Sequence, residues 1–172
     1  SGGVFYPDYF GKNFILNDLT HEGGLTAIRI EGPTNSVDQR IDRLSKELEL
    51  LSQEISILDT EQSNIFWNRT KNLEVFKNLK SNLFRIVVPM SETLQVIQKL
   101  KSNDVNYFID WGGSLVWMAF NEINTKILNE TKQIVKKHHG YYTIIKIEED
   151  LKATADIFTI DPIKYKICLL YT

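Results

Sequence analysis

Four basic side chains lie on or beside segments that the sequence predicts to be structured: Arg29, Arg69, Lys71 and Arg85. A guanidinium group can bind a carboxylate through two parallel hydrogen bonds, so a positioned arginine suits a small acidic substrate. The competing interpretation is a solvated or salt-bridged face, and residue type alone favours it. Because carboxylate binding needs such cations, these four residues are the candidates for substrate binding that the sequence offers.

The other chemistry-bearing residues give weaker signals. His138 and His139 fall at the end of an expected helix, where the helix dipole favours a partly charged imidazole. His21 has no obvious partner, and no second ligand stands at metal-binding spacing from a histidine, so the sequence predicts no metal site. Cys168 lacks the electropositive setting of a nucleophile. Gly-rich phosphate cradles and GxSxG elbows are absent, and we predict no catalytic residue.

Composition narrows the class of protein. Of the 172 residues, 42% are hydrophobic and 24% are charged, as in ordinary folded domains. The formal net charge of -2 argues against nucleic acid as a main partner, because phosphate binding requires a basic surface. The single cysteine cannot form an internal disulfide. No apolar run approaches the roughly 18 to 20 residues of a membrane span. These features predict a cytoplasmic protein without a transmembrane segment.

The elements that must position these residues follow from the spacing of apolar side chains. Residues 1–22 show no sustained period and are expected to form an extended lead-in, which leaves residues 23–172 as one domain. Ser36, with Gln39 three residues later, has the spacing of a capping box. In the first half we expect a strand at 25–31, a helix at 37–52, a strand at 55–58 and a helix capped by Asp59 or Thr60.

The second half is expected to repeat this plan with one extra strand. We expect strands at 84–88, 105–109, 115–119 and 141–147, a helix beginning at Ser91 and another at 125–138. Leu94, Ile97 and Leu100 share a face of the first helix, and Gly140 stands at the C′ position of the second.

The element order and the charge pattern together predict the fold class. Arg29 alternates with Ile28 and Ile30, and Arg85 alternates with its apolar neighbours, as in sheets that bury one face. The order contains the split βαβ arrangement. It predicts an α+β fold, namely a duplicated ferredoxin-like sandwich in which an antiparallel sheet carries helices on one face.

The segment Asp110-Trp111-Gly112-Gly113 follows one of the expected strands. An acid, a bulky aromatic residue and two glycines at this place indicate a tight turn that needs a positive φ or a close backbone approach. Residue chemistry alone predicts a hairpin with a packed tryptophan. We therefore assign these four residues a structural role.

The same turn carries a resemblance to a known family. Phe84-Arg85-Ile86-Val87-Val88-Pro89, followed by residues 109–113, resembles the E subunit of bacterial glycolate oxidase, one of the FAD-linked oxidases of the vanillyl-alcohol oxidase type. Further segments resemble that family in the same order: residues 24–32 with Ser36, Val37 and Arg40, then Trp67 with Lys71, residues 140–143, and Ile157-Phe158. The resemblance spans about residues 20–160 and concerns the C-terminal domain only.

The resemblance implies a cap or substrate domain of a parent enzyme that uses FAD to oxidise a small 2-hydroxy acid. It also implies flavin and iron–sulfur subunits as partners, and peripheral attachment to the inner membrane through them. The four cations would then be available to the substrate, although Lys71 replaces a family arginine and cannot form the bidentate fork.

Two departures from the family limit what the chain can do. The FAD-binding domain is missing. The family's ending, an Asp-Pro pair followed by an Asn-Pro-Gly stretch, is missing too, because Asp161-Pro162 comes too early to be that pair. We therefore expect no FAD on this chain and no activity without the FAD domain. The chain is either a separated part of a larger protein or the product of a split or decaying gene.

A second class of function is also open. A stand-alone ferredoxin-like domain would bind a small molecule, or act in regulation or assembly, through the open face of its sheet.

Overall fold

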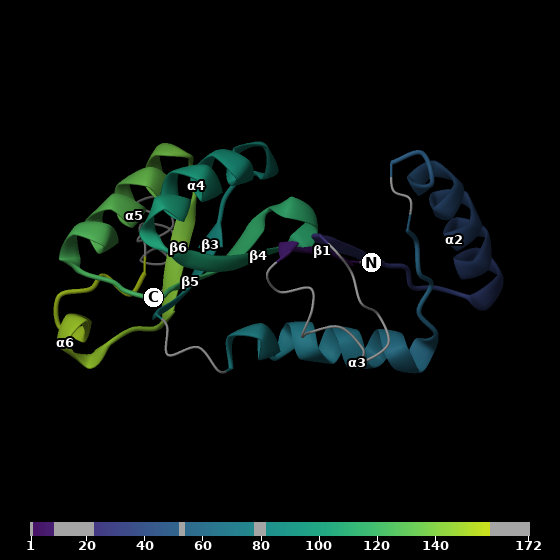
Figure 1. The fold of residues 1–172 in the computed structure, drawn as a ribbon, viewed down its shortest axis with the longest axis horizontal. Coiled ribbons are helices and arrows are strands. Elements are labelled where there is room, and N and C mark those ends of the chain that lie inside the picture. Colours follow the sequence, from purple (N-terminus) through teal and green to yellow (C-terminus); the bar gives the residue numbers. More distant parts are fainter. Residues whose placement is uncertain (1, 9–22, 52–53, 78–81, 159–172) are drawn as a thin grey trace, which may run out of the picture. The chain divides into compact units, whose positions relative to one another are not determined.

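The computed structural model describes residues 2–8, 23–51, 54–77 and 82–158 (Figure 1). They fall into two units, Ser1–Asn78 and Leu79–Thr172. Both units combine helices with antiparallel strands, which confirms the predicted α+β class. His21, Cys168 and the Asp161-Pro162 pair lie outside the described residues.

The first unit contains a pair of antiparallel strands followed by two helices. Its elements are β1 (Gly2–Tyr6), β2 (Leu25–Arg29), α2 (Thr34–Leu48), α3 (Thr60–Lys71) and the 3-10 turn η1 (Glu74–Phe76). The strand expected at 25–31 is therefore present. Its partner β1 lies within the expected lead-in, where the sequence showed no period. Tyr6 is buried, and its hydroxyl donates a hydrogen bond to Thr70 Oγ1 over 2.9 Å, which ties β1 to α3.

Two helix starts in this unit show how capping works. Asp59 caps α3 as predicted, because its side chain accepts from the Gln62 N–H over 2.8 Å while Gln62 Oε1 accepts from the Asp59 N–H. The prediction that Ser36 caps α2 is wrong. The helix begins earlier, after Pro33, whose carbonyl accepts from the N–H groups of Ser36 and Val37. Proline fixes φ in a range compatible with a helix start, so the turn closes before Ser36 is reached.

Two further expectations for the first unit are wrong. Residues 54–59 contain no strand, and Ile55 and Ile57 are exposed, so the described part of this unit does not repeat the plan of the second. Ile28 is also exposed, although the alternation with Arg29 predicted that it would be buried. The residue opposite Ile28 on β1 is Gly3, which offers no side chain to pack against.

The second unit is built around a four-stranded antiparallel sheet in the order β4-β5-β3-β6. Helices α4 and α5 cover the same face of this sheet (Figure 1). The elements are β3 (Asn82–Val87), η2 (Met90–Glu92), α4 (Thr93–Leu100), η3 (Lys101–Asn103), β4 (Val105–Asp110), η4 (Trp111–Gly113), β5 (Leu115–Phe120), α5 (Thr125–Lys137), β6 (Tyr141–Lys146) and α6 (Glu149–Lys152). All four predicted strands and both predicted helices of this half are present.

The core of the second unit lies between this sheet and its two helices. Phe84 and Ile86 of β3 are fully buried and face their register partners on β5, Met118 and Val116, which are also fully buried. The helices contribute the apolar residues Val96, Ile97, Leu100, Leu128 and Val135. Burial of each large apolar side chain stabilises the fold by about 1.5 to 3 kcal/mol. The alternation predicted for β3 is therefore confirmed, because Arg85 points to the opposite face.

Two details of the helices differ from the sequence prediction. Ser91 lies in η2 and does not cap α4, and Leu94 is 66% exposed. Leu94 lies about 120° around the helix from Leu100, so the two cannot share the centre of one face. Gly140 is not the left-handed C′ residue of α5; that residue is His139, with φ 58°.

Gly140 instead completes a Schellman motif at the end of α5. Its N–H donates to the carbonyl of Val135, and the His139 N–H donates to the carbonyl of Lys136. The backbone also passes very close to the sheet here. A Cβ atom on Gly140 would lie 2.3 Å from Val88 Cγ1 and 2.7 Å from the Val87 carbonyl oxygen. Any side chain at position 140 would therefore collide with Val87 and Val88, so this position requires glycine.

We predict that Gly140→Ala lowers the free energy of unfolding by about 2 to 3 kcal/mol, because backbone must shift to admit the methyl group. Urea denaturation of the two proteins measures this difference. Gly112→Ala is the matched control: its φ is 62° and no atom lies within 4 Å of the added Cβ, so we expect a cost of only about 1 kcal/mol. Equal effects of the two substitutions would contradict the close approach at Gly140.

Candidate functional site

Three of the four predicted substrate-binding cations lie in the first unit, and the two arginines among them already contact carboxylates. Arg29 Nη2 lies 2.7 Å from Glu31 Oε1, and its guanidinium carbon lies 6.0 Å from the centre of the Trp67 ring. Arg69 Nε lies 3.8 Å from a carboxylate oxygen of Glu74. Lys71 is an exposed residue at the last position of α3. An added acidic ligand would compete with the neighbouring glutamates at both arginines.

Arg85, the fourth candidate, lies in a different setting in the second unit. It occupies the middle of β3 between the fully buried Phe84 and Ile86, so its side chain leaves the sheet on the face opposite to theirs. Its register partners are Trp117 on β5 and Thr143 on β6. The guanidinium carbon lies 4.8 Å from the centre of the Trp111 ring, which is the geometry of a cation–π contact.

The Asp110–Gly113 turn holds Trp111 in this position. Trp111, Gly112 and Gly113 all have positive φ, at 53°, 62° and 114°, so the prediction of positive φ at the glycines is confirmed. The Asp110 carboxylate accepts from the Trp111 N–H over 2.7 Å. The Thr93 hydroxyl donates to the Gly113 carbonyl, which attaches the turn to the start of α4. A tryptophan with positive φ stores about 1 kcal/mol or more of backbone strain.

Asp110 lies on the same face of the sheet as Arg85 and is half-buried. Burial raises the pKa of its carboxyl group above the usual range. The hydrogen bonds from the Trp111 N–H and the Trp117 side chain, and the charge of Arg85, act in the opposite direction without cancelling the effect of burial. The group therefore combines a guanidinium, a tryptophan and a carboxyl group with a raised pKa. Trp111 is 58% exposed, so the prediction of a packed tryptophan at this turn is wrong.

This arrangement is suited to binding. Arg85 can receive a carboxylate, and the exposed ring of Trp111 offers an apolar surface beside it. The described ranges, which end at residue 158, contain no group of three histidine, cysteine or acidic residues placed to hold a metal ion. The Arg85–Trp111–Asp110 group is accordingly a candidate binding site.

Sequence reasoning missed a second polar group in the same unit. His138 is buried at the end of α5, where its Nδ1 lies 2.6 Å from Glu92 Oε2 and its Nε2 lies 2.7 Å from Lys99 Nζ. A lysine can only donate, so Nε2 accepts and the Nδ1–H donates to Glu92. These partners lie 46 and 39 residues away in sequence, so no local pattern could have indicated them. The chain of hydrogen bonds links η2, α4 and α5, which agrees with the structural role expected for His138.

No protein-family model matches this sequence, and no curated protein matches it at a significant level. None of the helices within the described ranges has both the length and the apolarity that crossing a membrane requires.

We predict that the free energy of unfolding of Asp110→Asn increases relative to that of the unmodified chain as the pH rises from about 3 to 7. A raised pKa in the folded state means that protonated Asp110 stabilises the fold below the ordinary carboxyl pKa. This contribution is lost as the pH rises through the raised pKa, and an asparagine has no such loss. Denaturation curves across this pH range measure the difference in unfolding free energy between the two proteins.

At the acid end of the range, where neither side chain carries a charge, the two stability profiles should run parallel. If the unmodified chain instead gained stability over Asp110→Asn with rising pH, the ionised carboxylate would be net favourable, and the dominance of burial would be refuted.

Proposed function

We propose that this chain is the C-terminal cap or substrate domain of a glycolate-oxidase-like subunit that oxidises 2-hydroxy acids with FAD. The observation that carries the proposal is the contact of Arg85 with Trp111. It brings together the two segments in which the resemblance to that family is strongest, residues 84–89 and 109–113. A side-chain contact between segments that share the same resemblance supports a preserved functional unit more than either segment does alone.

The fold of the second unit supports the same proposal. Its elements follow one another as β3-α4-β4-β5-α5-β6, and its sheet has the order β4-β5-β3-β6. This is the connectivity of a ferredoxin-like domain, the fold that the resemblance implies. Ile157 and Phe158, another part of the resemblance, lie beside β6: the Ile144 N–H donates to the Ile157 carbonyl over 3.0 Å, and Phe158 pairs with Thr143.

In this proposal Arg85 receives the carboxylate of the substrate, and Trp111 limits the access of water to that ion pair. Arg29 and Arg69 are weaker candidates because each contacts a glutamate, and Lys71 can offer only a point charge. FAD, held by another domain or subunit, would supply the hydride acceptor. The sequence contains no glycine-rich phosphate cradle that could hold the FAD. In this proposal the role of the chain is therefore to orient the substrate.

We predict that the purified chain is colourless and does not reduce an acceptor dye with glycolate. Tagged in its native host, it should co-purify with a flavin subunit and an iron–sulfur subunit. Absorbance spectra, dye reduction and mass spectrometry of the co-purified proteins measure these outcomes. Flavin absorbance with glycolate-dependent reduction by the lone chain would show that it works without an FAD domain. A lone, monodisperse protein in the host would count against the assembly.

In that assembly, we predict that Arg85→Ala raises the KM for glycolate by about 10- to 100-fold, because it removes a charge-assisted hydrogen bond to the substrate carboxylate. Steady-state kinetics with glycolate measure the effect. Lys101→Ala removes an exposed cation of the same unit and should leave the KM unchanged. If both variants gave the KM of the unmodified enzyme, Arg85 would not bind the substrate.

The alternative is a stand-alone ferredoxin-like domain that binds a small molecule or acts in regulation or assembly. One observation favours it: Arg85 and the exposed Trp111 contact each other within the second unit alone, so this pair needs no cofactor domain to assemble. Thermal-shift measurements with amino acids and small hydroxy acids discriminate the two. A large shift with an amino acid, and no association with flavin proteins, would favour this alternative.

A further inference from the structure

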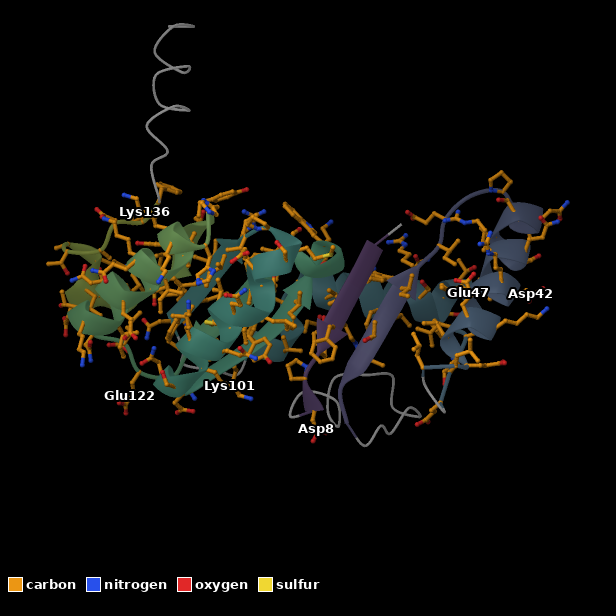
Figure 2. The ribbon with its side chains drawn as sticks, turned by 90° about the horizontal axis from the view of Figure 1, so that it is seen from above. Asp8, Asp42, Glu47, Lys101, Glu122 and Lys136 are labelled. Atoms are coloured by element: carbon orange, nitrogen blue, oxygen red, sulfur yellow. The ribbon has the colours of Figure 1, made fainter. Side chains whose placement is uncertain are left out.

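Helix α2 in the first unit has an apolar face that the rest of its unit covers only in part. None of its 15 residues is buried. Yet Val37, Ile41, Leu44 and Leu48 lie along one face, while charged residues such as Asp42 and Glu47 occupy the others (Figure 2). In a folded domain the apolar face of an amphipathic helix packs against another element. The part-exposed face of α2 therefore leaves apolar surface that a partner can bury.

The spacing on this face is compatible with the a and d positions of a coiled coil. Starting at Val37, the apolar positions within α2 are separated by four, three and four residues, which covers about two heptads. If Ile41 and Leu48 take the a positions of the heptad, Val37 and Leu44 take the d positions. A face with this spacing is suited to another helix that has the same spacing.

The same face opens into a groove of about 720 Å³ between α2, β2, residues 54–58 and α3. Several large apolar side chains line it and are exposed: Ile28 is 48%, Leu51 85% and Ile57 64% exposed. These exposed apolar side chains lie among polar ones such as Ser45 and Glu54, so the groove is a mixed surface. Its apolar side chains extend the surface that a second helix would meet.

We propose that this surface is occupied by a second copy of the chain, with the two α2 helices antiparallel. In that arrangement each a position faces a d position of the other copy, so Ile41 lies against Leu44 and Leu48 against Val37. The g positions, Arg40 and Glu47, then face each other across the pair. Because the arrangement has two-fold symmetry, the oppositely charged contact between Arg40 and Glu47 occurs twice.

Charge complementarity selects this direction over the parallel one. In a parallel pair in register, Arg40 at g would face Ser45 at e, and no ion pair would form there. The antiparallel pair also sets opposite ends of the two helix dipoles side by side. Within one chain, Arg40 Nη1 donates to the Glu31 carbonyl over 3.3 Å, and Glu47 lies 3.1 Å from Arg43 Nε. These contacts are exposed and leave room for an ion pair between Arg40 of one copy and Glu47 of the other.

The size of the surface sets the strength of the association. A helix of 15 residues is about 22 Å long. Two such helices bury less than the roughly 1,600 Å² of a standard stable interface, even with the groove residues added. We therefore expect a reversible dimer that forms as concentration rises.

Sedimentation equilibrium of the full chain tests the proposal. The unmodified chain should show a monomer–dimer equilibrium, and Leu44→Asp should raise its dissociation constant by at least about tenfold, because it places a charge at a central layer of the pair. Lys46→Asp, at an exposed position on the other side of the same helix, is the matched control and should leave the constant unchanged. A monomer at every concentration would overturn the proposal.

Charge variants test the direction of pairing and keep the proposal falsifiable should Leu44→Asp fail to fold. Arg40→Glu and Glu47→Arg should each weaken the dimer by about fivefold, and the double variant R40E/E47R should restore it, because both contacts become attractive again. Circular dichroism checks that helix content is retained. A dimer indifferent to all three variants would overturn the antiparallel pairing. A chain that stays monomeric while Leu44→Asp lowers its melting temperature would show that α2 closes onto its own unit, which would also overturn it.

Discussion

The alternation of side chains along β3 is the constraint on which the second unit depends. β3 pairs on both sides, with β5 and with β6, so its register is fixed twice. Phe84 and Ile86 are fully buried, whereas Arg85 between them emerges on the opposite face. A slip by one residue would bury the guanidinium and expose two large apolar side chains, at a cost of several kcal/mol. The core therefore determines where Arg85 lies, and the candidate binding face is a consequence of the packing beneath it.

The Asp110–Gly113 turn depends on the same sheet. Its register places Asp110 opposite Leu115, and the backbone must reverse through three residues with positive φ before β5 can begin. The hydrogen bond from Thr93 to the Gly113 carbonyl and the bond from the Trp111 N–H to Asp110 hold this strained path. These two hydrogen bonds offset the backbone strain and keep the indole ring beside the Arg85 guanidinium.

Much of the second unit could be predicted from the sequence, because its signals are local. Alternation in β3, two glycines after β4 and the apolar face of α5 each act over a few residues. The errors arose where a second cause competed with the local one. Ser36 has the residue type of a cap but Pro33 starts the helix first, and Ile28 alternates correctly but faces a glycine. The contacts of His138 with Glu92 and Lys99, and of Arg85 with Trp111, join distant segments, so only the fold could disclose them.

Helices α2 and α5 show most clearly what local sequence patterns cannot predict. Both have an apolar face at helical spacing, and both helices form. Leu128 and Val135 of α5 are buried against the sheet, whereas Ile41 and Leu44 of α2 remain half-exposed. The spacing of apolar residues predicts that one face of a helix packs against something, but it does not identify the partner. A half-exposed side chain forgoes only part of the about 1.5 to 3 kcal/mol that full burial of a large apolar side chain contributes. Against a net stability of about 5 to 15 kcal/mol, the part forgone by four such residues favours association of α2, and their spacing of four, three and four residues suits another helix.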